Sequence, residues 1–147
     1  MSDVAVSDKL DRRDKWRNLA KHQYRGHGAS GRAGSAWLDG RKLDAVIHMG
    51  AISDTTATDG DLVMENNFRP SLRLLDWCTA TRTPFIYASS AATYGDGSHG
   101  FRRRLVADAL AQAQPMNLYG WSKHLFDLAV VDRFTQERKT AAAMGRA

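Results

Sequence analysis

The sequence predicts an α/β protein, with a partial parallel β-sheet flanked by helices. Two kinds of segment carry this prediction: short apolar runs typical of buried strands, and longer segments whose apolar residues recur at helical spacing. The predicted strands lie near residues 3–7, 44–49 and 84–88. The predicted helices lie near residues 14–21, 61–81 and 118–138.

The N-terminal part begins with a short β-type run, Asp3–Ser7, which is closed by the acidic residue Asp8. After the first predicted helix, the hydrophobic periodicity fails from residue 23 to about residue 40. Two glycine-rich stretches in this part, 26–28 and 31–34, have no strand before them and no apolar helix after them. We therefore expect a flexible loop there rather than a phosphate-binding turn.

The middle of the chain reads as a second strand followed by a long helix. The largely apolar segment 43–49 is typical of a parallel strand that is buried on both faces. Asp59 or Asp61 is expected to cap the helix that follows. Pro70 lies inside that helix and removes one backbone donor, so we expect a bend near residues 66–67.

The chemistry is expected where the third strand ends. The apolar run Pro84–Ala88 is followed by the hydroxyl residues Ser89 and Ser90, at a place where such a strand opens into a cleft. Tyr119 and Lys123 are four residues apart, so on a helix they share one face. A cation beside a phenol favours the phenolate, and a serine hydroxyl can hold a substrate oxygen. The sequence thus predicts a proton-transfer site for an alcohol or a carbonyl group.

A tyrosine and a lysine at this spacing also occur as plain surface residues on many helices. Together with Ser-Ser-Ala-Ala-Thr-Tyr-Gly at residues 89–95, however, the pair resembles the extended short-chain dehydrogenase/reductase family of nucleotide-sugar epimerases and dehydratases. Residues 48–56, 65–68 and 115–120 are similar to the same family. The likeness covers residues 4 to about 19, 43 to about 100 and 115 to about 140.

The resemblance implies a Rossmann-like fold, NADP or NAD as the cofactor, and an isomerase that acts on a sugar nucleotide. It also implies three catalytic residues. Ser90 would hold the substrate oxygen and Tyr119 would move its proton. Lys123 would tune Tyr119 and hold the nicotinamide ribose of the cofactor.

Further cofactor-binding residues are implied at the ends of the first two predicted strands and in the helix after them. They are Asp8, Lys15, Met49, Gly50, Ala51, Ile52, Ser53 and Asn66. Asp8 would bond the adenosine ribose and Lys15 would receive a 2′-phosphate, as in other dinucleotide-binding folds. Plainer interpretations stay open: a solvated charged loop for Asp8 and Lys15, a strand-to-loop turn for Gly50, and a capping or solvated side chain for Asn66.

The chain also departs from the family pattern. It has no Gly-x-x-Gly-x-x-Gly turn, which in such folds brings backbone amides to the cofactor pyrophosphate. We therefore expect residues 1–140 to form an incomplete dinucleotide-binding domain, with a tail at 141–147 and no substrate domain, in which cofactor binding is weakened or lost. Residues 23–42 and 101–114 do not resemble the family, and a shifted reading frame in the coding DNA is one hypothesis for them.

Composition limits the remaining classes of function. A chain of 147 residues with 43% hydrophobic content predicts one domain with a modest core. It has neither an apolar run long enough to cross a bilayer nor a signal pattern at its start, so we expect a cytoplasmic location. Cys78 is the single cysteine and lies in an apolar helical run, which favours a buried, inert thiol. No metal site is expected.

Three hypotheses for function follow. The first is an epimerase of the resembled family, and the second is a non-catalytic remnant that associates with a full-length relative or with itself. The third is a nucleic-acid-binding module, which rests only on the net charge of +5. The Arg triplet at 102–104 is more typical of a solvated face, and no aromatic residues alternate with the basic ones, so nucleic acid is the weakest of the three.

Overall fold

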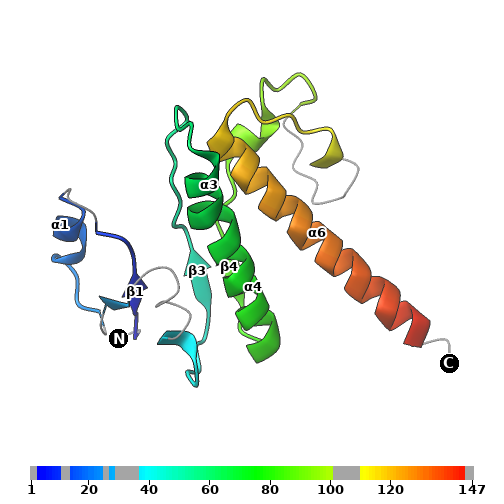
Figure 1. Cartoon of the computed structure of the whole chain (residues 1–147). Coiled ribbons are helices and arrows are strands. Elements are labelled where there is room, and N and C mark those ends of the chain that lie inside the picture. The colour runs from blue at the N-terminus through cyan, green and yellow to red at the C-terminus, as the bar shows by residue number, and fades with distance from the viewer. Residues whose placement is uncertain (1–2, 11–13, 25–26, 29–36, 101–109, 145–147) are drawn as a thin grey trace. The chain divides into compact units, whose positions relative to one another are not determined.

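The structure, a computed structural model, describes residues 3–10, 14–24, 27–28, 37–100 and 110–144. The chain divides into two units, Met1–Ala45 and Val46–Ala147, which are described separately (Figure 1). The glycine-rich stretch at 31–34 and the Arg triplet at 102–104 lie outside the described residues.

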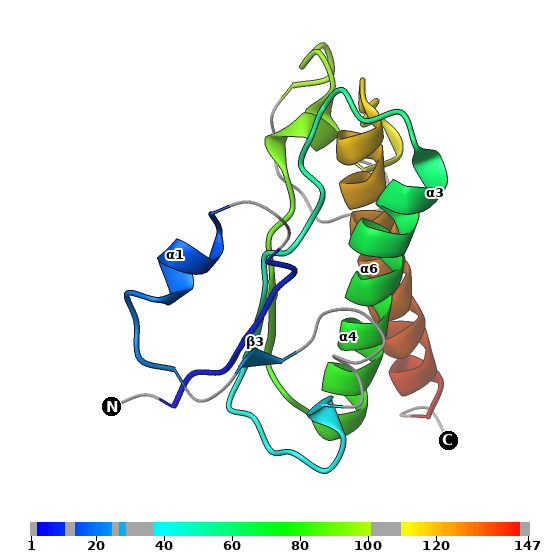
Figure 2. The same ribbon diagram turned by 60° about the vertical axis from the view of Figure 1, so that its left-hand side comes forward.

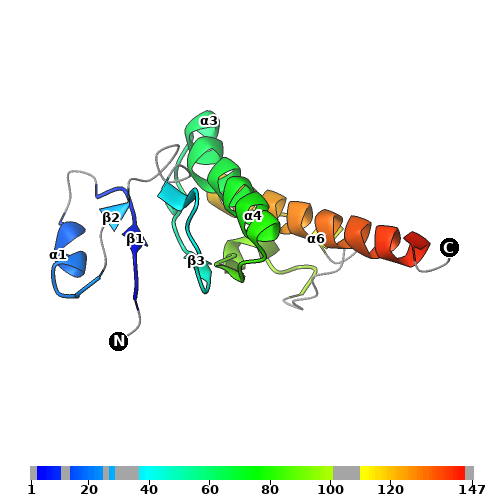
Figure 3. The ribbon, with the colours of Figure 1, turned by 90° about the horizontal axis from the view of Figure 1, so that it is seen from below.

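The first unit contains a short parallel pair of strands. β1 (Val6–Ser7) pairs with β2 (His27–Gly28), with Val6 opposite His27 (Figure 3). The predicted strand near 3–7 is thus present in a shorter form. Residues 27 and 28, which were expected to belong to a flexible loop, form a strand instead. β2 has only two residues, which is too short for an alternating hydrophobic pattern. It also pairs with β1, which is distant in the sequence, so a local pattern cannot predict this strand.

The rest of the first unit rests on local contacts. α1 (Trp16–Leu19) is shorter than the helix predicted for 14–21. Near the end of the unit, Leu38 is buried, and Arg41 Nε donates to the Trp37 carbonyl at 2.7 Å. The Arg41 guanidinium also lies 4.3 Å from the centre of the Trp37 ring, a cation–π arrangement.

The second unit is built on a parallel strand pair of its own. β3 (Val46–His48) pairs with β4 (Phe85–Tyr87) in the register Val46 to Phe85, Ile47 to Ile86 and His48 to Tyr87. In the described residues the predicted strands therefore form two separate two-stranded sheets. Two helices, α4 (Arg69–Thr81) and α6 (Leu118–Met144), lie on the same side of β3 (Figure 2).

The strand 43–49 was expected to be buried on both faces, and this was wrong. Ile47 is 66% exposed and its cross-strand neighbour Ile86 is 56% exposed. Side chains alternate along a strand, so Phe85 and Tyr87 point to the opposite face, where both rings contact Phe126 of α6 edge-on. The core of this unit thus lies on the helix side of the strand pair, with Val63, Leu75, Cys78, Phe126 and Val131 buried.

The helical segment after β3 has three parts: α3 (Gly60–Val63), the π-helical turn η1 (Met64–Phe68) and α4. Asp59 caps its start, because its carboxylate accepts a hydrogen bond from the Leu62 amide at 2.9 Å. The irregularity expected beside Pro70 is present as the π-turn, in which the Arg69 amide donates to the Met64 carbonyl five residues earlier. Pro70 has no amide hydrogen and sits in the first turn of α4, where none is needed.

After β4 the chain forms the 3₁₀ turn η2 (Ala91–Tyr94) and later α6. The helix predicted for 118–138 is confirmed and continues to Met144, so the predicted tail from 141 begins as helix. Three consecutive alanines at 141–143 favour this continuation. No helix in the described part of the chain is long and apolar enough to span a membrane.

Candidate active site

The site is organised by the first turns of α6. Asn117 precedes the helix and caps it: its Oδ1 accepts from the Gly120 amide at 2.8 Å, and its carbonyl accepts from the Trp121 amide at 2.9 Å. This cap sets where the helix starts. Tyr119 therefore lies in the first turn and Lys123 in the second, on the same face.

Lys123 is buried against the end of β4. Its side chain is 2% exposed, and Nζ donates to the Ala88 carbonyl at 2.9 Å. The ammonium also lies 4.8 Å from the centre of the Tyr87 ring. Burial lowers the pKa of Lys123, and the charge of Asp127 acts in the opposite direction. The structure thus places a cation at the carboxyl end of a parallel strand, where such folds bind ligands.

Ser90 begins the turn η2, which packs on the first turn of α6. Its Oγ accepts from the Ala92 amide at 3.1 Å, which uses a lone pair and leaves the hydroxyl hydrogen as a donor. A Cβ added at Gly120 would lie 2.6 Å from the Ala92 carbonyl oxygen, so glycine allows η2 to approach the helix. The predicted catalytic residues Ser90, Tyr119 and Lys123 are therefore carried by segments in direct contact.

Tyr87 borders the same site as Tyr119. Its pKa is raised, first by burial and then by the charges of Asp127 and Tyr119, so its phenol stays protonated. The Tyr87 hydroxyl is 3.4 Å from the Lys123 carbonyl, to which it donates. Tyr87 is therefore a neutral residue beside Lys123.

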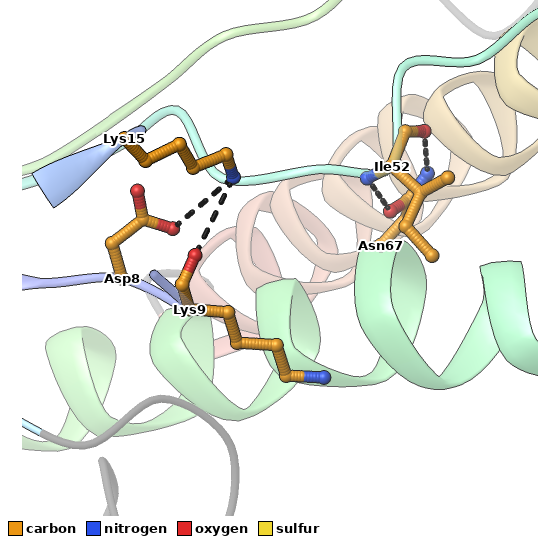
Figure 4. Close-up of polar contacts among 5 residues, drawn as sticks. All are labelled: Asp8, Lys9, Lys15, Ile52 and Asn67. Atoms are coloured by element: carbon orange, nitrogen blue, oxygen red, sulfur yellow. Dashed lines mark hydrogen bonds and ion pairs between the residues drawn. The ribbon is translucent and has the colours of Figure 1, made fainter. Parts of the chain in front are cut away.

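Sequence reasoning missed Asn67, which links the predicted cofactor loop to the catalytic helix. Its side chain is 1% exposed, and its amide group clamps Ile52 from both sides: Oδ1 accepts from the Ile52 amide at 2.7 Å and Nδ2 donates to the Ile52 carbonyl at 3.0 Å (Figure 4). Nδ2 also donates to Ser122 Oγ at 3.0 Å, and Ser122 donates to the Tyr119 carbonyl at 2.7 Å. One buried amide thus connects the loop after β3 with the turn between Tyr119 and Lys123.

The sequence pointed instead to the neighbouring Asn66. In the structure, Asn66 Nδ2 donates to the Leu62 carbonyl at 2.7 Å, within the same helical segment. Both asparagines lie in the π-turn η1, where Asn67 is buried and Asn66 is partly exposed. The only available signal was the pair of asparagines just before Pro70, which does not tell which of the two turns inward.

A second polar contact joins β3 to α4. His48 Nε2 and Ser71 Oγ are 2.9 Å apart, and Ser71 in turn donates to the Asn67 carbonyl. Burial, together with the charge of Lys123, lowers the pKa of His48 from 6.5 to about 4. His48 is thus neutral near pH 7, and its ring stacks beside those of Phe85 and Tyr87 without adding charge.

The predicted cofactor residues divide between the two units. Met49, Gly50, Ala51, Ile52 and Ser53 form the loop directly after β3, where Met49 is 73% exposed and Ile52 is held by Asn67. In the first unit, Lys15 Nζ lies 3.9 Å from Asp8 Oδ1 and 3.5 Å from the Lys9 carbonyl, to which it donates (Figure 4). The structure therefore brings Asp8 and Lys15 together at the end of β1, with both side chains about half exposed.

No group of three or more metal-ligating side chains occurs within residues 3–10, 14–24, 37–100 and 110–137. The polar groups of the candidate site are one buried ammonium, two phenols and a serine hydroxyl. Parallel strands with polar groups at their carboxyl ends are typical of the class of Rossmann-like α/β proteins, which bind their ligands at that edge of the sheet.

The chain belongs to the NAD dependent epimerase/dehydratase family, which it matches over residues 2–147. It is 45% identical over 131 residues to the ADP-L-glycero-D-manno-heptose-6-epimerase of Nitratidesulfovibrio vulgaris strain DP4, an alignment that covers 87% of this chain and 40% of that protein. The protein of the same name from Fusobacterium nucleatum is 40% identical over 140 residues, covering 86% and 39%. The chain thus spans about 40% of the length of these curated relatives.

Solved structures agree with this family. The chain superimposes on the Helicobacter pylori ADP-L-glycero-D-manno-heptose-6-epimerase with a TM-score of 0.69 and 28% identity, covering 89% of this chain and 42% of that one. The UDP-Glc/GlcNAc 4-epimerase of Campylobacter jejuni follows with a TM-score of 0.64 at 24% identity, which supports the fold alone. The predicted Rossmann-like α/β fold and the resemblance to nucleotide-sugar epimerases are both confirmed.

Proposed function

We propose that this chain forms the redox and proton-transfer part of an ADP-glycero-manno-heptose 6-epimerase, an isomerase of lipopolysaccharide precursor synthesis in the cytoplasm. The names of relatives at 40–45% identity support this substrate. The observation that carries the proposal is the position of Lys123. Its buried ammonium donates to the Ala88 carbonyl, and Ala88 lies two residues before Ser90 in the chain. On α6, Lys123 lies one helical turn after Tyr119.

Bound NADP would supply reversible hydride transfer at a sugar carbon. The chain's own residues manage the proton and the geometry. Ser90 is fixed by its bond to the Ala92 amide, and its free hydroxyl donor holds the sugar oxygen. Tyr119 takes the proton of that oxygen and later returns it. The sugar is thus inverted with no net oxidation.

The residues present fit part of such a cofactor. Lys123 offers ammonium hydrogens to a ribose hydroxyl, and the exposed loop 49–53 is anchored at Ile52 by Asn67. Asp8 and Lys15 together offer an acceptor for the adenosine ribose and a cation for a 2′-phosphate, which favours NADP over NAD.

A titration of the chain with NADPH, followed by tryptophan fluorescence and by calorimetry, tests the proposal. We expect saturable binding that is tighter than binding of NADH. Lys123→Met should weaken it tenfold or more, since a charge-assisted hydrogen bond contributes about 1.5–3 kcal/mol. Lys21→Met is the matched control, because Lys21 is an exposed lysine in a turn outside the site.

A folded chain that binds neither cofactor would overturn the proposal. That outcome favours the second candidate, a non-catalytic module that associates with a full-length relative or with a second copy of itself. Trp121 and Phe134 on α6 are 44% and 58% exposed, so each is an apolar side chain that such an association would cover. Analytical ultracentrifugation of the chain, alone and mixed with a full-length epimerase, separates these possibilities.

A further inference from the structure

Asp127 continues the row of polar residues that begins with Tyr119 and Lys123 on α6. The three residues follow one another at intervals of four, which places each about one turn beyond the last on the same face. Asp127 is 7% exposed, and its Oδ2 accepts a hydrogen bond from Ser89 Oγ at 2.6 Å. The proton-transfer steps described above do not use this carboxylate.

The Ser89–Asp127 bond and the Lys123–Ala88 bond form a pair of adjacent anchors. Residues 88 and 89 at the end of β4 meet two successive turns of α6, through Lys123 Nζ at 2.9 Å and Asp127 Oδ2 at 2.6 Å. The next residue of the chain is Ser90. Both anchors therefore fix the backbone from which the predicted substrate-holding hydroxyl projects.

Burying the ammonium of Lys123 costs free energy unless a negative charge lies close by. Its bond partner, the Ala88 carbonyl, is neutral. Asp127 is the carboxylate that opposes the effect of burial on the Lys123 pKa, and the neighbouring His48 is held neutral. Tyr87 from β4 and Tyr119 and His124 from α6 complete the titratable surroundings, and Asp127 also counteracts the burial-induced fall in the His124 pKa.

We propose that Asp127, held by Ser89, is a positioning residue that keeps the buried Lys123 side chain protonated and seated against the end of β4. The proposal rests on the role proposed for Lys123, because the protonated side chain carries three N–H donors for the Ala88 carbonyl and a cofactor ribose, and its charge strengthens these hydrogen bonds. Asp127 itself touches neither substrate nor cofactor. It acts through Lys123 and through the backbone at 88–90.

The surroundings of Asp127 leave room for conservative variants. Ser89 and Asp127 line a cavity of about 350 Å³, together with residues of α4, β4 and α6. Asp127→Glu keeps the charge and has space for one extra methylene group. Asp127→Asn removes the charge but keeps the size and an oxygen acceptor for Ser89. Ser89→Ala removes the hydrogen bond and keeps the charge.

The direct measurement is the pKa of the Lys123 side chain, followed by NMR of the chain labelled at lysine, with the signal assigned by its loss in Lys123→Met. We expect Asp127→Asn to lower this pKa by about one unit or more. Asp127→Glu should restore at least half of the shift, and Ser89→Ala should change the pKa less than Asp127→Asn does. Asp132→Asn is the matched control, because Asp132 lies on the exposed part of the same helix, and it should leave the pKa unchanged.

NADPH affinity, measured at one pH between the pKa values of the wild type and of Asp127→Asn, gives the second readout. There Asp127→Asn should bind about tenfold more weakly than the wild type, and Asp127→Glu should bind nearly as well as the wild type. A merely structural Asp127 would alter folding without moving the Lys123 pKa.

The inference is overturned if the Lys123 pKa in folded Asp127→Asn equals that of the wild type, or if Asp132→Asn shifts it equally. Should Asp127→Asn fail to fold, Asp127→Ser takes its place, because it also removes the charge. A Lys123 pKa at least one unit below that of the wild type in folded Asp127→Ser supports the inference, and a wild-type pKa there refutes it. If the pKa shifts as expected but no variant binds NADPH, the inference stands and the proposed function fails.

Discussion

The two units of this chain differ in how they hold the polar residues of the candidate site. In the second unit, Lys123, Asp127 and Asn67 are nearly inaccessible to solvent and have hydrogen-bond partners at 2.6–3.0 Å. In the first unit, Asp8 and Lys15 are about half exposed and 3.9 Å apart. The comparison teaches that Lys123 and its neighbours are held by a packed core, whereas the interaction of the predicted ribose-binding pair is screened by water.

The largest expected effect comes from the core of the second unit. Phe126 is 1% exposed, and its ring lies edge-on to Tyr87 with the centroids 4.4 Å apart. Phe126→Ala should lower the free energy of unfolding by about 3–5 kcal/mol. Leu38→Ala in the first unit should cost about 2 kcal/mol, at the low end for a buried leucine. Denaturant unfolding followed by circular dichroism measures both, and an equal loss in the two variants would contradict the contrast between the units.

The close contact between η2 and α6 offers the next test. An alanine Cβ at position 120 would lie 2.6 Å from a backbone oxygen and 3.0 Å from the Ala92 carbonyl carbon, so no side-chain rotation relieves the clash. Gly120→Ala should destabilise the chain by about 2–3 kcal/mol and weaken any NADPH binding. In Gly60→Ala the new Cβ meets nothing within 4 Å, and the variant should be neutral or more stable by about 0.5 kcal/mol. Thermal unfolding of both variants measures the two changes in stability. A Gly120→Ala variant as stable as the wild type would show that η2 does not pack closely against the first turn of α6.

Acid should destabilise the second unit through His48. Its pKa is lowered to about 4 in the folded chain, first by burial and then by Lys123, against 6.5 when unfolded. The unfolded chain therefore binds the extra proton, so stability is complete above pH 6.5 and falls as the pH drops from 6.5 toward 4. The loss should be about 2 kcal/mol after allowance for partial exposure of the ring.

Comparison of unfolding free energies at pH 7 and pH 4.5 isolates this effect. His48→Gln keeps a hydrogen-bonding partner for Ser71 and should show the smaller pH dependence. His22→Gln, at an exposed position of the first unit, should retain the full dependence of the wild type. A His48→Gln variant as sensitive to acid as the wild type would assign the effect to other groups.

The smallest effect is expected from the pair in the first unit. A double-mutant cycle of Asp8→Asn and Lys15→Met should give a coupling free energy between 0 and about 1 kcal/mol, since exposed ion pairs contribute little. The same measurement in high salt should reduce it further. A coupling well above 1 kcal/mol would mean that the first unit positions its charges as firmly as the second.

Much of the candidate site could be predicted from local patterns. The helix that carries Tyr119 and Lys123 begins after a capping asparagine, and its apolar residues recur at helical spacing, so both its existence and the shared face of the pair follow from the sequence. Asp59 as a helix cap and the irregularity beside Pro70 follow in the same way, because each depends on residues within one helical turn.

Other features depend on segments that are distant in the sequence, and local patterns carry no information about them. The clamp of Asn67 on Ile52, the bond from Ser89 to Asp127 and the pairing of β1 with β2 are of this kind. The exposure of Ile47 also belongs here, since an apolar strand does not reveal how many of its faces a helix will cover. The sequence by itself determined the α/β class, the family and the Tyr119–Lys123 pair, because these arise from helical and strand periodicity and from short motifs. Only the tertiary structure decided which asparagine turns inward, which carboxylate accompanies the buried ammonium and which face of the strands is bare, because packing between distant segments selects among side chains that local rules treat as equivalent.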